Sequence, residues 1–171
     1  MVNSEWAYWS CVHTWARIQS MRIIVTGDRN WYASDLAEQV INRLLVRYGP
    51  GLVIVHGGAT GIDRSFAEAC GELGVEQEAH PANWEEMDHP EAVIRYDKRN
   101  RPYNANAGPI RNAKMVAEGA GMCLAFHRAI SACKGTKDCA RRAIAAGIPT
   151  YLIDSDAAAP KRLRAADARL E

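Results

Sequence analysis

The sequence predicts an α/β fold, specifically a Rossmann-like three-layer sandwich built on a mostly parallel five-stranded sheet. Short apolar runs alternate along the chain with longer segments in which apolar residues recur at helical spacing. Glycines follow most of these segments, at points where a helix or strand must end. The composition, with 48% hydrophobic and 24% charged residues, is that of a soluble globular protein.

The length of 171 residues fits one domain with a sizeable core. We expect the Rossmann-like domain at residues 21–154, with a lid at about residues 80–107 and a solvated C-terminal tail at residues 155–171. Residues 1–20 hold three of the five tryptophans and precede Met21, where an apolar strand begins. Either the native protein begins at Met21, or residues 1–20 form an N-terminal arm that docks on the domain or on a partner.

The first three elements are a strand, a helix and a second strand. Residues 23–26 form a short, largely apolar run, as expected for a parallel strand covered on both faces. Residues 34–48 carry leucines and a valine at helical spacing and stop at Gly49 and Pro50, which favour a helix C-terminus. Residues 52–55 are again apolar and predict the neighbouring strand.

The later elements repeat this alternation. A helix begins near Ile62 and ends before Gly74, and residues 75–79 form a short strand. The remaining elements are a helix from Gly108 to about Glu118, with Pro109 in its first turn, a strand at residues 122–126, a helix at residues 136–146 and a strand at residues 150–153. Because this alternation implies right-handed crossovers, the carboxyl ends of the strands share one edge of the sheet.

Residues 80–107 interrupt the alternation. They hold Pro81, Pro90 and Pro102 among many charged side chains. Connections longer than about 12 to 15 residues are commonly functional. We therefore expect a lid over the ligand site, with one helical turn near residues 91–96.

Charge and cysteine content argue against several classes of function. The 21 Lys and Arg residues nearly cancel the 20 Asp and Glu residues, whereas a nonspecific nucleic-acid binder needs a large basic excess. No apolar run approaches the roughly 18 residues that span a bilayer. The five cysteines lack CxxC spacing and predict reduced thiols in a cytoplasmic protein. We expect neither a membrane nor nucleic acid as the partner.

Two groups of potential metal ligands lack the spacing of known metal sites. They are His127 with Cys133 and Cys139, and His80 with Asp88 and His89. We expect no metal, and no cofactor besides a nucleotide-derived ligand.

The ligand site is expected where the parallel strands end, because open α/β sheets bind ligands at that edge. After the first strand, Thr26 and Gly27 form a tight turn that lets the backbone approach a ligand, and Arg29 is placed to reach a phosphate. The alternative is an ordinary turn with a solvated arginine.

A glycine-rich motif follows the second strand. Gly57, Gly58 and Gly61 are expected to present main-chain amides to an anion at a helix N-terminus. The motif is neither GxGxxG nor a P-loop, so the usual dinucleotide and NTPase assignments do not apply. Thr60 and Asp63 either contact the ligand or cap the helix.

The third helix begins with Gly108, Arg111 and Asn112 close together. A cation in the first turn opposes the helix dipole, so Arg111 indicates an anionic partner. That partner is either a ligand or the acidic side chains of the lid.

A second anion site is expected at the start of the fourth helix. His127, Lys134, Gly135 and Thr136 bring cations, a glycine and a hydroxyl to this point, although Thr136 also suits a simple cap. The resulting pocket requires that Gly58 and Gly135 lie on one edge of the sheet, with amides free of internal hydrogen bonds.

With these residues in place, the chain resembles the SLOG superfamily of Rossmann-like proteins, and within it the YspA-related branch. The resemblance spans roughly residues 21–153. It is carried by VTGDRNW at residues 25–31, HGGATGID at 56–63, AGPIRNAKM at 107–115 and KGTKDC at 134–139.

The superfamily includes the LOG-type phosphoribohydrolases, which cleave the N-glycosidic bond of nucleoside monophosphates with an Arg and a Glu. The resemblance carries the catalytic Arg over to Arg111, whereas Cys139 occupies the place of the catalytic Glu. Asp138 is the nearest replacement, but one residue along a helix rotates a side chain by about 100°. The resemblance therefore implies ligand binding more strongly than hydrolysis.

We accordingly expect a sensor or binding module for a nucleotide-derived small molecule, such as an ADP-ribose or NAD-like compound; a homo-oligomer is compatible with this. One alternative is a nucleotide N-glycosidic-bond hydrolase that uses Asp138 or a lid carboxylate such as Glu85 or Asp88. A second is a DNA-associated protein like the DprA members of the superfamily. Trp31 and Trp84 either stack on a base or pack in the core.

Overall fold

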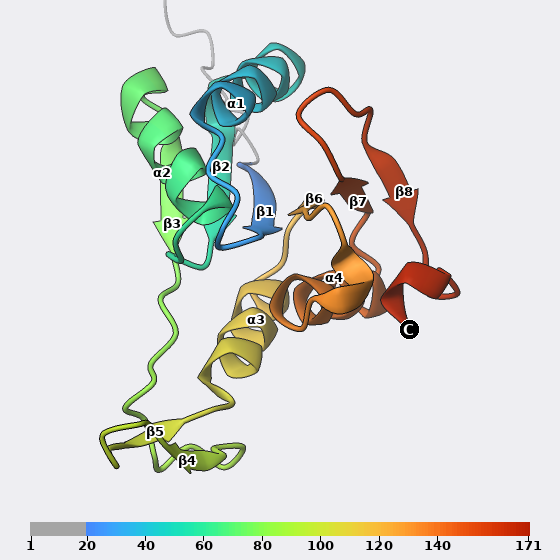
Figure 1. Ribbon diagram of the computed structural model, residues 1–171. Helices are drawn as coiled ribbons and strands as arrows, with labels where there is room; N and C mark the ends of the chain where they lie inside the picture. Colours follow the sequence, from blue (N-terminus) through green and yellow to red (C-terminus); the bar gives the residue numbers. More distant parts are fainter. Residues whose placement is uncertain (1–19) are drawn as a thin grey trace, which may run out of the picture.

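The computed structural model describes residues 20–171, so the expectations for Trp6, Trp9, Trp15 and Cys11 lie outside the described residues. The fold is α/β and Rossmann-like, as predicted, with a sheet in the order β3-β2-β1-β6-β7-β8 (Figure 1). Its strands are β1 (Met21–Gly27), β2 (Leu52–His56), β3 (Glu76–Ala79), β6 (Met122–Phe126), β7 (Thr150–Ile153) and β8 (Lys161–Leu163). All neighbours pair in parallel except β8, which pairs antiparallel with β7.

Four α-helices cover the two faces of the sheet. They are α1 (Ser34–Tyr48), α2 (Ile62–Leu73), α3 (Ala107–Ala117) and α4 (Gly135–Ala145). Short 3₁₀ helices lie at Gly49–Gly51, Ile130–Ala132 and Ala168–Leu170. Along β1, Ile23 and Val25 pack with α1 and α2, whereas Ile24 packs with α3 and α4 on the other face. This alternation follows from the two-residue period of a strand.

The chain reverses its direction of travel across the sheet at β1. It proceeds outward through β2 and β3, and then returns to the other side of β1 with β6 and β7. Ligands of open α/β sheets bind beside such a reversal, at the carboxyl ends of the strands. A ligand site is therefore expected beyond Gly27 and Phe126, the last residues of β1 and β6.

The sheet has one strand more than the sequence predicted. The helix at residues 34–48 and the strands at residues 122–126 and 150–153 have the expected bounds. The sixth strand, β8, lies in residues 155–171, which were expected to form a solvated tail. Leu163 and Leu170 from this segment are buried against β7 and α4. A three-residue edge strand with two cations gives little apolar signal, which is why it was missed.

Residues 80–106 form a separate small lobe that projects from the main body (Figure 1). Its two strands, β4 (Ile94–Tyr96) and β5 (Pro102–Asn104), make an antiparallel hairpin. The helical turn predicted at residues 91–96 is wrong, because this stretch is a turn followed by β4. The buried Asn104 organises the lobe: its side chain accepts from the Val93 amide (3.1 Å) and donates to the Glu86 carbonyl (2.9 Å).

None of the helices within residues 20–171 has the length and apolar character needed to cross a membrane.

Candidate functional site

A cavity of about 270 Å³ opens where β1 and β6 end, and we call it the rim cavity. Eight predicted site residues line it, from all four strand-to-helix connections. They are Thr26, Gly27, Arg29, Asp63, Arg111, His127, Gly135 and Thr136. The lining is completed by four residues that were not predicted as ligand contacts: Asp28, Asn30, Ala59 and Cys133. These four residues could have been found from the sequence because they lie next to, or within two residues of, Arg29, Gly58 and Gly135.

A second cavity of about 260 Å³ adjoins the rim cavity, and we call it the Trp84 cavity. Gly57, Gly58 and Thr60 line it together with Pro81, Ala82 and Trp84 from the small lobe. Arg29, Ala59 and Arg111 line both cavities. The lobe therefore contributes to the site, as the predicted lid would, although through its first residues.

Arg111 stands between the two cavities. Its Nε donates to Asn112 Oδ1 (3.0 Å) and its Nη1 to the His80 carbonyl (3.2 Å). Burial lowers the pKa of the Arg111 guanidinium, and the nearby Asp63 carboxylate opposes that shift. The group stays charged, because arginine does not deprotonate in proteins. Among residues 20–171, no carboxylate oxygen lies within 4.0 Å of it, so this half-buried cation lacks a direct ionic partner.

Gly57 makes room for the Arg111 side chain. A Cβ atom at position 57 would lie 1.4 Å from Arg111 Nη1, so the guanidinium rests on the glycine backbone. The sequence predicted Gly57 as an amide donor to a ligand. Its observed contribution is the space that Arg111 occupies.

The amides of the glycine-rich loop are largely used within the protein. Gly58 N donates to His56 Nδ1 (3.1 Å), and Ala59 N donates to Asp63 Oδ2 (3.2 Å). His56 and Asp63 are both buried, and buried polar groups require partners. The expectation that the Gly58 amide is free for an anion is therefore wrong. In the sequence, the presence of His56 and Asp63 on either side of the glycine-rich loop was the signal that its amides have partners within the protein.

Asp63 is the buried carboxyl group of the rim cavity. Burial raises its pKa, while the Ala59 amide, the Arg111 charge and other neighbours oppose that shift. The sequence left two roles open for Asp63, a ligand contact and a cap. It accepts from the loop amide of Ala59, and α2 has no side-chain cap, so the capping role is not observed. Asp63 lines the rim cavity, and its contact with a ligand stays a prediction.

Two other glycines serve close packing between connections. Gly61 has a φ of 71°, and a Cβ there would lie 2.2 Å from the Asp28 carbonyl oxygen. A Cβ on Gly27 would lie 2.5 Å from Ile62 Cβ. Glycine is thus required at both positions, because the segment between β1 and α1 is in close contact with the segment between β2 and α2.

The N-terminus of α4 forms the opposite wall of the rim cavity. A Cβ at Gly135 would meet no atom within 4 Å, so its backbone faces open space. Thr136 is buried, and its amide contacts Cys133 Sγ at 3.4 Å. Asn112 fixes this turn by donating to the Gly135 carbonyl (3.2 Å). Gly135 shares the rim cavity with Ala59, so the two glycine-bearing turns do lie on one edge of the sheet.

Several predicted residues line neither cavity. They are Gly61, Gly108, Asn112, Lys134 and Asp138, together with the lid carboxylates Glu85 and Asp88. Asp138, proposed from sequence as a substitute catalytic acid, binds Arg142 Nε (2.9 Å) and Asn112 Nδ2 (3.0 Å). The candidate acid Asp138 therefore lies outside the rim cavity, whereas Asp63 lines it.

Trp31 and Trp84 have different environments in the structure. Trp31 is 5% exposed, packs edge-on against Phe126 and donates its indole N–H to Asp156 (3.1 Å). Trp84 is 39% exposed and lines the cavity that bears its name. Sequence alone could not separate them, because each depends on which elements meet in space.

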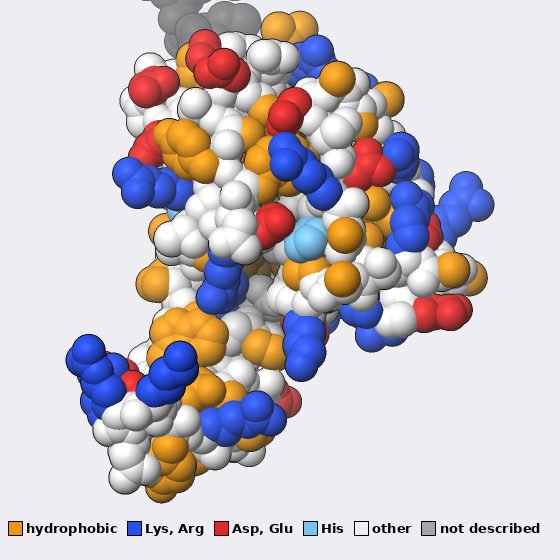
Figure 2. Space-filling view, viewed as in Figure 1, with side chains coloured by type: hydrophobic (Ala, Val, Ile, Leu, Met, Phe, Trp, Pro, Cys, Tyr) orange, Lys and Arg blue, Asp and Glu red, His pale blue; other side chains and the backbone are white. Residues whose placement is uncertain are grey.

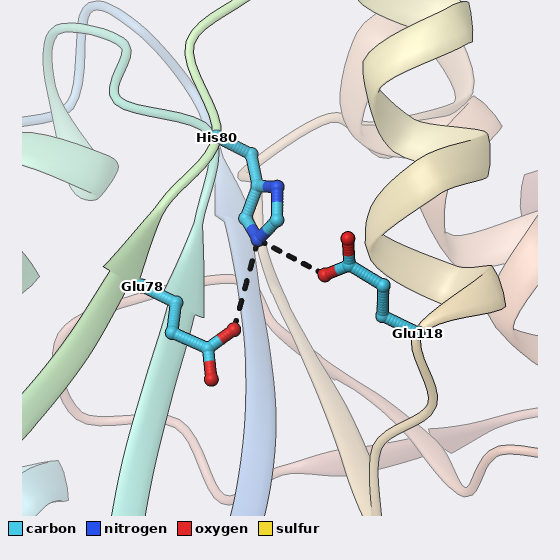
Figure 3. Close-up of side chains that lie close together, drawn as sticks. All are labelled: Glu78, His80 and Glu118. Atoms are coloured by element: carbon cyan, nitrogen blue, oxygen red, sulfur yellow. Dashed lines mark ion pairs between the residues drawn. The ribbon is translucent and has the colours of Figure 1, made fainter.

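An ion-pair network supports the start of the small lobe. His80 points at Glu78 and Glu118, with Nε2 to carboxylate distances of 3.7 and 3.3 Å (Figure 3). Arg22 pairs with the same two carboxylates. Among residues 20–171 these three side chains are the one group with metal-ligand proximity, so neither set of ligands weighed from sequence comes together. Because Arg22 pairs with both carboxylates, the cluster is explained as a structural tie between β1, β3 and the end of α3.

The surface of the small lobe is rich in Lys and Arg (Figure 2). Exposed cations on and beside the hairpin are Arg95, Lys98, Arg99 and Arg101. Asp97 pairs with Arg101 at 2.8 Å. The overall charge balance of the chain thus conceals a locally basic lobe.

Comparison with known proteins gives a consistent picture. A family model described as "YspA, cpYpsA-related SLOG family" matches residues 21–87. The Gene 61 protein of Mycobacterium phage D29 is 35% identical over 133 residues, which cover 75% of this chain and 92% of that protein. DNA processing protein A (DprA) from Streptococcus pneumoniae is similar in structure, with a TM-score of 0.56 and 21% sequence identity. That match covers 81% of this chain and 52% of DprA, so the chain spans about half the length of DprA and the likeness concerns the fold.

Proposed function

The chain belongs to the YspA, cpYpsA-related SLOG family, and we propose that it binds a nucleotide or nucleotide-derived ligand through phosphate groups, as a sensor or binding module. The observation that carries this proposal is Arg111. A half-buried guanidinium without a direct ionic partner among the described residues borders two open cavities. Burying a charge is costly unless it is paired, so such a cation favours an anionic ligand.

Further groups in the rim cavity suit a phosphate. Arg29 adds a second cation, and the start of α4 adds a helix N-terminus with an open glycine backbone. The Asp28 carboxylate is directed to the Asn30 amide (2.9 Å) and lies 3.9 Å from His127 Nε2. The Asp28 carboxylate thus has partners within the protein.

The role proposed for main-chain amides differs from the one expected from sequence. Gly58 and Ala59 donate to His56 and Asp63, so they orient the loop. The phosphate contacts in our proposal come from Arg29, Arg111 and the first turn of α4.

Thermal-shift and calorimetric titration with nucleotides test this proposal. A ligand at about 100 times its dissociation constant should stabilise the wild-type protein by about 2.7 kcal/mol. Arg111→Ala should abolish the shift, and Arg43→Ala, at an exposed position of α1, should leave it unchanged. The proposal fails if no nucleoside phosphate stabilises the wild type, or if Arg111→Ala binds as tightly as Arg43→Ala.

One observation favours hydrolysis as a second candidate function. Asp63 places a carboxyl group of raised pKa in the same cavity as Arg111. Cleavage of a glycosidic bond needs a carboxyl group near the bond. Release of free base from nucleoside monophosphates by the wild type, lost in Asp63→Asn, would establish this activity. Tight binding without release would leave the protein a binding module.

A further inference from the structure

We propose that the Trp84 cavity is the site for the base of the ligand, with Trp84 as its stacking surface. The ligand would then be a nucleoside phosphate that lies across both cavities, its phosphate in the rim cavity and its base on the indole. This inference rests on the proposed function and specifies which part of the ligand each cavity receives.

The two cavities differ in chemistry. The rim cavity has two arginines and a helix N-terminus, whereas the Trp84 cavity combines an indole with Pro81, Ala82 and glycine backbone. Arg29 and Arg111 line both, so no separate wall divides them. A molecule with an anionic end and a flat, weakly polar end matches this pair. Aromatic side chains bind bases by stacking, because every base has a π-face.

The position of Trp84 is fixed by its surroundings. Its carbonyl accepts a hydrogen bond from the Asn104 amide (2.7 Å), which ties it to β5. The Arg29 guanidinium lies 5.7 Å from the centroid of the indole, within the range of a cation-π contact. A Cβ at Gly108 would come within 4.0 Å of Trp84 Cη2. The backbone of Trp84 is therefore tied to β5, and its ring lies beside Gly108 of α3 and Arg29, next to the open cavity.

Apart from Arg29 and Arg111, which the proposal assigns to the phosphate, the cavity offers few side-chain groups for reading the edge of a base. Thr60 is the hydroxyl in its lining, and that hydroxyl already donates to the Arg29 carbonyl (3.1 Å). Because the base would be recognised mainly through the area that it stacks on Trp84, purines should bind more tightly than pyrimidines. It also predicts little discrimination between adenine and guanine.

Binding measurements on variants of Trp84 test this inference. The ligands are adenosine, guanosine and cytidine monophosphates, with ribose 5-phosphate as the probe that lacks a base. Trp84→Ala should weaken binding of the purine nucleotides about tenfold to a hundredfold and leave ribose 5-phosphate within about twofold. Trp84→Phe should retain most of the affinity. Tyr96→Ala is the matched control, because Tyr96 is an exposed aromatic of the same lobe that lines neither cavity.

The outcomes separate the two proposals. Failure of every nucleoside phosphate, these three included, to bind the wild type would overturn the proposed function and this inference together. If the nucleotides bind but Trp84→Ala binds them as the wild type does, the base lies elsewhere and only the inference fails. An equal loss for ribose 5-phosphate and the nucleotides would show that Trp84 acts on the fold of the lobe, which would also refute the stacking role.

Discussion

Arg111 occupies space that any side chain at position 57 would fill. Alanine at this position would place its Cβ 1.4 Å from Arg111 Nη1, so the guanidinium must leave its present position and its hydrogen bond to His80. Gly57→Ala is therefore expected to weaken nucleotide binding as strongly as Arg111→Ala does. The rearrangement should also lower the free energy of unfolding by about 1–3 kcal/mol. Calorimetric titration and chemical denaturation measure the two effects.

Gly71→Ala is the control for this substitution. Gly71 lies within α2, and a Cβ there would meet no atom within 4 Å. Alanine is favoured over glycine inside a helix by about 0.5–1 kcal/mol, so this variant should gain stability and keep its affinity. Undiminished affinity in Gly57→Ala would show that the position of Arg111 does not matter for binding.

Single residues also show how far the sequence could predict the site. A cation in the first turn of a helix is a local signal, and it led to Arg111 without any structure. The engagement of the Gly58 amide depends instead on the His56 ring, whose orientation is set by Gln77 on β3 (2.9 Å). The difference between Trp31 and Trp84 likewise depends on tertiary contacts. Contacts of this kind leave no pattern in the local sequence.

Within the main sheet, β8 is the strand that the sequence did not predict. Leu163 is 1% exposed and packs with Leu152 of β7 and Ala140 of α4. Leu163→Ala is expected to lower the free energy of unfolding by about 2–5 kcal/mol, because it removes buried methyl groups and leaves a cavity. Val46→Ala, at a position of α1 that is 91% exposed, should change it by less than about 0.5 kcal/mol. Equal midpoints for both variants in chemical denaturation would show that residues 155–171 contribute nothing to the fold.

The elements that the sequence did predict share a physical property. Parallel strands buried on both faces and helices with one apolar face have strong periodic signals, and their bounds agree within a few residues. The β4–β5 hairpin and β8 are three-residue strands at edges or outside the main sheet. Their formation depends on partners such as Asn104 and β7, so their own composition predicts loop or tail.

In the molecule as a whole, two apolar layers share a single sheet. Cys70 lies in the layer with α1 and α2, and Cys123 lies in the layer with α3 and α4. Burial raises the pKa of Cys70 to about 11, and a hydrogen bond with Cys139, together with burial, raises the pKa of Cys123. Both thiols should therefore be unreactive in the native state, because the thiolate is the reactive form.

Thiol labelling at increasing denaturant can test whether the two layers unfold together. Since β1 contributes side chains to both layers, we expect Cys70 and Cys123 to become labelled with the same midpoint, as in two-state unfolding. Peptide mass spectrometry distinguishes the sites, and the half-buried Cys133 serves as the thiol that reacts first. Separate midpoints for the two cysteines would indicate that one layer opens without the other.

The small lobe leaves the body after β3 and returns at the start of α3, and the hydrogen bond from Arg111 to the His80 carbonyl (3.2 Å) closes this neck. Its internal order comes from its own hairpin and from Asn104, whereas the sheet is held by the two apolar layers. We therefore expect that replacing the hairpin at the tip of the lobe would leave the stability of the sheet largely unchanged. The periphery of the site could then be altered without disturbing the scaffold on which it stands.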